Sequence, residues 1–303
     1  MKALVHDPTA TAGLRHADVP DPVPGPGQVL MEVRATSLNF LDAAYRDERL
    51  AVGAVPGVDA AGVVVAPAGD GSGPAAGARV VAFGQGAWAQ RLAVDTADVA
   101  VLPDGVDLAV AAALPGAGVT ALRAVRRLGS VLGRRVLVTG ASGGVGRYAV
   151  QLAALAGSDV VAAVGSRERG AGLAGLGARD VVVGLDEVAG SVHSVLDTVG
   201  GPLLAEAFAL LAESGLALSI GQASRRPTTI DFEQERRRSG GRRLEPFVIG
   251  SGVGVDLQVL LDLVRRGRLD PQIGWRGSWL DAADAARALL DREVPGKAVL
   301  EVA

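Results

Sequence analysis

The sequence has no cysteine, only three histidines and no long apolar run, and each absence excludes a class of protein or site. Without cysteine, the chain of 303 residues forms no disulfide, has no thiolate nucleophile and lacks the commonest structural zinc sites. No stretch reaches the roughly 18 uninterrupted apolar residues that a membrane-spanning helix needs. The net charge of -3 shows no basic excess, so neither nucleic acid nor a membrane surface is a favoured partner.

The composition that remains is typical of a globular protein with a large core. Hydrophobic residues make up 49% of the chain, and its length is sufficient for two domains. The first residues, Met1 to Pro8, contain an acid and a proline and lack the long apolar core of a secretory signal peptide. We therefore expect a cytoplasmic protein that acts on a small molecule.

A glycine-rich turn follows the short apolar run Val136–Val138 and is the most informative segment. The run suits a buried parallel strand, and the glycines permit a sharp turn into a helix that begins at about Gly144. Backbone N–H groups of Gly143, Gly144 and Val145 are then expected to face a phosphate at the positive end of that helix. With a second strand at 160–164, this pattern indicates a dinucleotide-binding site.

The pattern of predicted secondary structure changes near residue 109. Before it, short β-rich runs alternate with Gly/Pro turns, which predicts a compact, mostly antiparallel β-domain. After it, strands alternate with Ala/Leu-rich helical stretches, which is typical of a doubly wound parallel sheet. Strands of this sheet are predicted at 136–138, 160–164, 181–183, 194–199, 215–220 and 246–249. A helix at 256–266, a helix at 280–291 and a strand at 297–302 then indicate a return to the first domain.

The stretch Arg225–Arg243 holds seven arginines and shows no apolar periodicity. Because acids at 231, 233 and 235 are interleaved, we interpret it as a solvated, mobile loop. A flap that grips a phosphate is the alternative interpretation.

Six motifs in order make the chain similar to the zinc-independent quinone oxidoreductases of the medium-chain dehydrogenase/reductase superfamily. They span essentially the whole chain and are Asn39–Asp42, Pro56–Val63, Ala112–Ala121, the glycine turn, Asp197–Gly201 and Gly296–Leu300. The resemblance implies an α/β protein with a GroES-like β-domain over residues 1–112 and 267–303 and a Rossmann NADPH-binding domain over residues 113–266. It also implies a homodimer that forms through the sheet edge near residues 247–250.

The positions of the superfamily's catalytic zinc ligands carry other residues in this chain. Asn39 stands where the zinc alcohol dehydrogenases have a cysteine, and Gly57-Val58-Asp59 stands where they have Gly-His-Glu. Valine cannot ligate a metal, and three histidines without cysteine cannot build that site from these motifs. We therefore expect no metal, and hydride delivery to a quinone or an α,β-unsaturated carbonyl, whose own conjugation delocalises the developing charge.

The residues after the second strand favour NADPH over NADH. An NAD-binding fold usually has an acid at the end of this strand, whereas residues 165–169 read Gly-Ser-Arg-Glu-Arg. Ser166 can donate to a 2′-phosphate, and Arg167 or Arg169 can neutralise it. Further cofactor contacts are expected at later strand ends and, from the resemblance, beside the carboxamide: Val199, Gly221, Phe247 and Val248.

Three polar side chains are candidates for the chemistry. The amide of Asn39 can donate to a substrate carbonyl or to the nicotinamide ribose, and Thr120 resembles the family threonine beside the nicotinamide. Either Tyr45 or solvent supplies a proton to the reduced substrate, although the family's tyrosine stands at the position of Ala44. We expect Asp42 to hold local backbone or to pair with Arg46 rather than to act as an acid.

Three functions are compatible with these features. The first is an NADPH-dependent reductase of quinones or enones. The second is an enoyl-thioester reductase, because reductase modules of polyketide synthases share the Asn-Phe-x-Asp and glycine-turn motifs. The third is a non-catalytic NADPH-binding sensor.

Overall fold

The structure, a computed structural model, describes residues 1–238 and 240–303 and divides into two compact units. Unit 1 comprises residues 1–119 and 250–303, and unit 2 comprises residues 120–249. The predicted boundaries, at 112/113 and 266/267, differ from this division by 7 residues at the first boundary and by 17 at the second. The later boundary differs because helix α8 (Gly254–Arg265) packs against strand β7 (Val99–Val101) and the turn Pro115–Val119 of unit 1.

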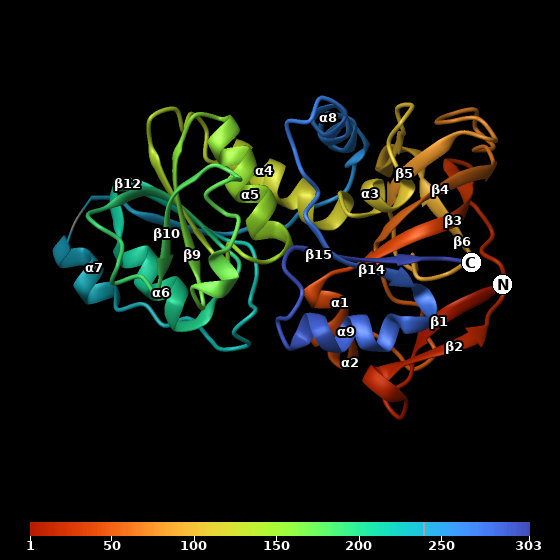
Figure 1. The fold of residues 1–303 in the computed structure, drawn as a ribbon, viewed down its shortest axis with the longest axis horizontal. Helices are drawn as coiled ribbons and strands as arrows, with labels where there is room; N and C mark the ends of the chain where they lie inside the picture. Colours follow the sequence, from red (N-terminus) through yellow and green to blue (C-terminus); the bar gives the residue numbers. More distant parts are fainter. Residues whose placement is uncertain (239) are drawn as a thin grey trace. The chain divides into compact units, whose positions relative to one another are not determined.

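Unit 1 is built on a seven-stranded, mostly antiparallel sheet, as the sequence predicts for its first part (Figure 1). Its strands are β3 (Gln28–Leu38), β4 (Asp59–Ala66), β5 (Arg79–Phe83), β6 (Arg91–Asp95), β7, β14 (Ile273–Ser278) and β15 (Lys297–Glu301). The eleven-residue strand β3 pairs with β4, with β6 and with β15. The last strand of the chain is therefore hydrogen-bonded to the first strand of the sheet.

Short elements surround this sheet. Strands β1 (Lys2–His6) and β2 (Leu14–Asp18) form a separate antiparallel pair. The helices of unit 1 are α1 (Phe40–Ala44), α2 (Arg46–Arg49), α3 (Leu108–Ala112), α8 and α9 (Ala282–Leu290). The core beneath them contains Met31, Trp88 and Leu300, each fully buried.

Unit 2 has a six-stranded, all-parallel sheet with the strand order β10-β9-β8-β11-β12-β13. The strands are β8 (Arg135–Thr139), β9 (Asp159–Val164), β10 (Ala178–Val183), β11 (Val192–Asp197), β12 (Leu211–Ser219) and β13 (Arg243–Pro246). Numbered within the unit, this order is 3-2-1-4-5-6, the order of a dinucleotide-binding fold, which confirms the predicted fold class. Its helices are α4 (Thr120–Arg127), α5 (Gly144–Leu155), α6 (Gly201–Ala209) and α7 (Phe232–Arg238).

Two predictions for the end of unit 2 are wrong. The sixth strand runs over Arg243–Pro246 rather than 246–249, and Val248 is 81% exposed. The arginine-rich stretch, interpreted as a loop, contains helix α7. Asp231, the residue before this helix, accepts hydrogen bonds from the backbone N–H groups of Glu233 and Gln234. Periodicity could not predict this helix because none of its residues is buried.

No helix among residues 1–238 and 240–303 is long and apolar enough to cross a membrane.

Candidate functional site

The glycine turn of unit 2 connects β8 to α5 and leaves the start of the helix bare. Gly143 is the N-cap residue of α5, and no side chain caps the helix there. Gly140 has a φ of +61°, and a Cβ on it would lie 2.3 Å from Thr198 Oγ1. Ser142 Oγ, also in this turn, is buried and has no partner among the described residues. The N–H group of Gly143 donates to the Gly140 carbonyl at 3.0 Å, so of the three predicted N–H groups it is those of Gly144 and Val145 that can face an anion. With the glycines of the turn and the positive helix end, they fit a pyrophosphate.

A buried hydrogen-bond network holds the ends of β8 and β11 together beside this turn. Asp197 accepts from the hydroxyl of Thr139 and, at 2.8 Å, from the backbone N–H of Gly200. Thr198 donates from its hydroxyl to the Thr139 carbonyl at 2.9 Å. Burial raises the pKa of Asp197, while these donors oppose the rise. The two strands flank the point where the strand order reverses, so the network shapes the place where such folds bind nucleotides.

The carboxyl edge of this sheet collects the cofactor residues predicted for unit 2, apart from Thr120, which begins α4. Because the six strands are parallel, the residues that follow them lie along one edge. The turn after β8 carries Gly143, Gly144 and Val145; β9 is followed by Ser166, Arg167 and Arg169, β11 by Val199, β12 by Gly221, and β13 by Phe247 and Val248. Gly221 is required locally, since a Cβ there would lie 2.7 Å from the Thr198 carbonyl oxygen.

The segment after β9 has one acid and two arginines. The hydroxyl of Ser166 donates to Glu168, and the bonds that Glu168 accepts hold the pKa of its exposed carboxyl below the usual value. The guanidinium of Arg169 lies close to Gly165, where a Cβ would come within 3.4 Å of Nη1. Arg167 is exposed, and its charge interacts with Glu168. The two arginines leave this strand end with net positive charge.

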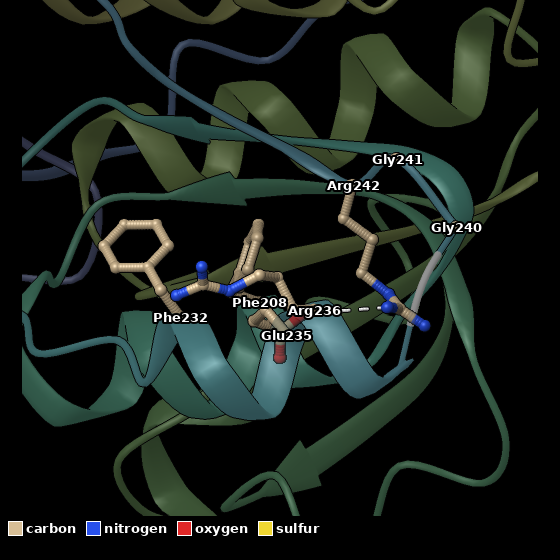
Figure 2. Close-up of a pocket in the computed structure, with 7 residues that line it drawn as sticks. All are labelled: Phe208, Phe232, Glu235, Arg236, Gly240, Gly241 and Arg242. Carbon is tan, nitrogen blue, oxygen red and sulfur yellow. Dashed lines mark ion pairs between the residues drawn. The ribbon is translucent and has the colours of Figure 1, made fainter.

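The arginine-rich segment turns away from this edge. Arg226 stays near the carboxyl edge, packed against Gly201 at the start of α6. Arg242 instead donates from Nε to the carbonyl of Leu211, the first residue of β12, at 2.7 Å. A hollow of about 530 Å³ lies here, at the edge of the sheet where β12 and β13 begin, and Arg242 pairs there with Glu235 at 3.6 Å. Figure 2 shows the side chains that line it. The other lining residues are Phe208, Phe232, Arg236, Gly240 and Gly241.

Unit 1 contains a second polar cluster, centred on a buried ion pair. Lys297 Nζ lies 3.3 Å from Asp59 Oδ2, and the two side chains are 2% and 0% exposed. The ammonium also donates to Asn39 Oδ1 at 2.7 Å and to the Leu38 carbonyl at 3.0 Å. Its three hydrogens thus have three acceptors.

The carboxylate of Asp59 is equally well satisfied. Its Oδ2 accepts from Ser37 Oγ at 2.6 Å and from Asn39 Nδ2 at 2.9 Å. Its Oδ1 accepts from the backbone N–H of Gly116 at 2.6 Å, and a Cβ on Gly116 would lie 2.9 Å from that oxygen. A charged pair this deeply buried is tolerated only with such complete hydrogen bonding.

Asp42 lies next to this cluster at the third position of α1. Its Oδ2 accepts from the backbone N and from Nδ2 of Asn39, both at 3.2 Å, which completes a capping box. Burial raises the pKa of Asp42 to about 6, and the charge of Asp59 adds to this rise. Bonds from Asn39 and the charge of Lys297 lower it. Arg46 does not pair with Asp42, and instead donates to the Ala12 carbonyl.

The structure thus places Asn39, with Asp42, in a network that the sequence analysis did not foresee. Lys297, Asp59 and Ser37 were not predicted as site residues, because 238 positions separate Lys297 from Asp59. The one available signal was that Lys297 is one of only two lysines in the chain. Tyr45 joins α1 to α2 and is partly buried. Among the described residues, no three histidine, aspartate or glutamate side chains come together as a metal site.

The two lysines offer a matched test of the buried ion pair. Lys297→Met leaves the Asp59 carboxylate buried without its counter-charge, so we expect the free energy of unfolding to fall by about 3–5 kcal/mol. Lys2→Met breaks the exposed pair with Asp18, which water and salt screen, so it should lower the free energy of unfolding much less. Denaturant unfolding of both variants measures the difference, and equal effects would contradict a structural role for the pair.

The glycine turn can be tested with an added methyl group. A Cβ on Gly146 would lie 2.3 Å from the Gly140 carbonyl oxygen and 2.7 Å from Ala141 Cα, both backbone atoms. We expect Gly146→Ala to lower the free energy of unfolding by about 1–3 kcal/mol. Gly175→Ala is the control, since its nearest atom would be 3.4 Å away on an exposed segment, and it should change stability by less than about 0.5 kcal/mol.

Comparison with known families and proteins agrees with this architecture. The profile of the alcohol dehydrogenase GroES-like domain matches residues 25–104, and the profile named zinc-binding dehydrogenase matches residues 173–300. Among solved structures, the mycobacterial protein Rv1454c in complex with NADPH superposes with a TM-score of 0.86 at 28% identity, over 99% of both chains.

Two curated relatives differ greatly in length. A stretch of erythronolide synthase EryA2 of Saccharopolyspora erythraea is 35% identical over 88% of this chain, but the chain spans only 8% of that protein. Quinone-oxidoreductase QR1 of Triphysaria versicolor is 30% identical, over 99% of this chain and 98% of the relative. The resemblance of the motifs is confirmed: the chain belongs to the quinone oxidoreductase family of the medium-chain dehydrogenase/reductase superfamily.

Proposed function

We propose that this protein is an NADPH-dependent oxidoreductase that reduces a quinone or an α,β-unsaturated carbonyl without zinc. The observation that carries the proposal is the bare, glycine-lined start of α5 at the carboxyl edge of a 3-2-1-4-5-6 sheet, with Arg167 and Arg169 after the neighbouring strand. Bound NADPH would supply the hydride, and the protein would supply orientation and polarity. The NADPH complex of the mycobacterial relative supports this choice of cofactor.

The choice of NADPH over NADH depends on the charges after β9. A 2′-phosphate would meet Arg167 and Arg169, and would compete with Glu168 for the hydroxyl of Ser166. The positive charges of Arg167 and Arg169 outweigh the negative charge of Glu168, which favours a cofactor that carries the 2′-phosphate. The remaining predicted contacts, Thr120, Val199, Gly221, Phe247 and Val248, belong to the same proposal.

The absence of zinc is proposed from the residues at the vacated ligand positions. Asn39 and Asp59 are engaged by the ammonium of Lys297, and Val58 offers no ligand atom. A positive side chain within hydrogen-bond distance of both oxygens disfavours a divalent cation beside them. The acceptor should therefore be a molecule that delocalises charge by itself.

The alternative function, reduction of an enoyl thioester, is supported by the match to erythronolide synthase EryA2. A non-catalytic NADPH-binding sensor is the third possibility. A homodimer through residues 247–250 also stays a prediction, for which unit 2 offers β13, a strand with one neighbour in its sheet.

The function is tested by NADPH oxidation with a panel of quinones, linear enones and enoyl thioesters. We expect absorbance at the NADPH band to fall on addition of a quinone or enone, with NADH much less effective. Turnover confined to thioesters would favour the alternative. Tight NADPH binding without turnover on the whole panel would identify a binding protein instead.

The phosphate contacts are tested by two variants and one control. Arg167→Ala and Arg169→Ala should each raise the Kd for NADPH by about 10-fold to 100-fold and leave the Kd for NADH unchanged, because each removes a charge-assisted bond to the phosphate. Arg179→Ala, at the amino end of β10, should change neither constant. Equal losses for both cofactors would argue against a 2′-phosphate site.

A further inference from the structure

The amide of Asn39 is fully engaged inside unit 1. Its Oδ1 accepts from Lys297, and its Nδ2 donates to Asp59 and to Asp42, so each polar atom and hydrogen of the amide has a partner. Turning the amide over would set Nδ2 against the ammonium of Lys297 and Oδ1 against the carboxylate of Asp59. The two charges therefore fix the amide in an orientation that leaves no donor for a substrate.

Asp42 is the member of this group that keeps a polar atom available. Its Oδ2 receives both bonds from Asn39, whereas its Oδ1 accepts no hydrogen bond from the described residues. Because Oδ1 is not among the fully buried atoms that lack a partner, and the side chain of Asp42 is only partly buried, this oxygen keeps some contact with solvent. The carboxyl is thus held on one side and accessible on the other.

The charges around Asp42 come from four elements. Asp59 on β4 opposes a second negative charge, whereas Lys297 on β15 and Arg46 on α2 favour one. Helix α9, which packs against α1, carries Asp284 and Arg287, but these are exposed and paired with each other. Burial, the largest cause, and the charge of Asp59 raise the pKa of Asp42 to about 6 against the lowering effect of Asn39 and Lys297, so its carboxyl exchanges a proton near neutral pH.

We propose that the carboxyl of Asp42 donates the proton that completes reduction of the acceptor, and that Asn39 is its positioning residue. This inference rests on the proposed function. Hydride addition leaves the acceptor as an enolate or hydroquinone anion. The O–H bond of Asp42 then breaks, its proton bonds to the anionic oxygen, and the electron pair stays on the carboxylate, which solvent protonates again at the accessible oxygen. An enol formed by protonation of the enolate oxygen then tautomerises to the saturated carbonyl.

The first test compares Asp42→Asn with Asp47→Asn, an exposed acid on α2. Loss of a general acid should lower kcat about 100-fold or more with an enone, while the Kd for NADPH, measured by fluorescence, stays unchanged. In the wild-type protein kcat/KM should fall as pH rises through about 6, because the donor must carry its proton, and this fall is the descending limb of the pH profile. Asp42→Asn should abolish this limb, and Asp47→Asn should leave rate and limb intact.

A second variant tests the role of Asn39. Its bonds lower the pKa of Asp42, so Asn39→Ala should shift the limb to higher pH rather than remove it. A purely structural loss would lower the rate without moving the limb. Infrared difference spectra of the free protein against Asp42→Asn should show a carboxyl band that disappears near pH 6.

The outcomes separate the inference from the proposed function. An active wild-type enzyme with an unaltered limb in Asp42→Asn, or a limb lost instead in Tyr45→Phe, would overturn the inference and leave the function standing. A carboxyl that stays ionised down to pH 4 in the free protein would also overturn it. A wild-type protein that oxidises no NADPH with any acceptor would refute the function, and the proton transfer with it.

Discussion

The buried ion pair between Lys297 and Asp59 is the interaction on which unit 1 depends. Removing two charges from water is costly, and the pair persists because every donor and acceptor around it is matched. Its partners come from β3, β4, the turn at Gly116 and β15, which are far apart in the chain. The pair therefore selects one arrangement of these elements, and it also fixes the amide of Asn39.

The same pair changes the chemistry available at the family's Asn-Phe-x-Asp motif. From the sequence alone, the asparagine would be expected to offer a free amide. In the structure, this amide accepts from Lys297 and donates to both Asp59 and Asp42, so it links the ion pair to Asp42 by hydrogen bonds. A carboxyl that shares a donor with a second carboxylate is disfavoured as an anion. In the proposed mechanism, the asparagine of this motif positions the acid and does not itself donate to the substrate.

Unit 2 depends on a different constraint, the closeness of backbones at the glycine turn. Gly146 approaches the Gly140 carbonyl so closely that no side chain fits, and Gly140 adopts a left-handed conformation. The network of Thr139 and Asp197 holds the two neighbouring strands at the same place. Its role was missed in the sequence, although Asp197 stands in a motif quoted for the family, because only strand pairing shows that Thr139 is its neighbour.

Sequence patterns by themselves determined the class of each unit, the positions of most strands and the dinucleotide turn, since apolar periodicity and glycine act over a few residues. They failed at α7 and β13, which bury little side chain and carry no periodic signal. Only the tertiary structure decided which side chains meet at Asp59 and what Asn39 can still donate to. Hydrogen bonds between residues 20, 57 and 238 positions apart leave no trace in local sequence.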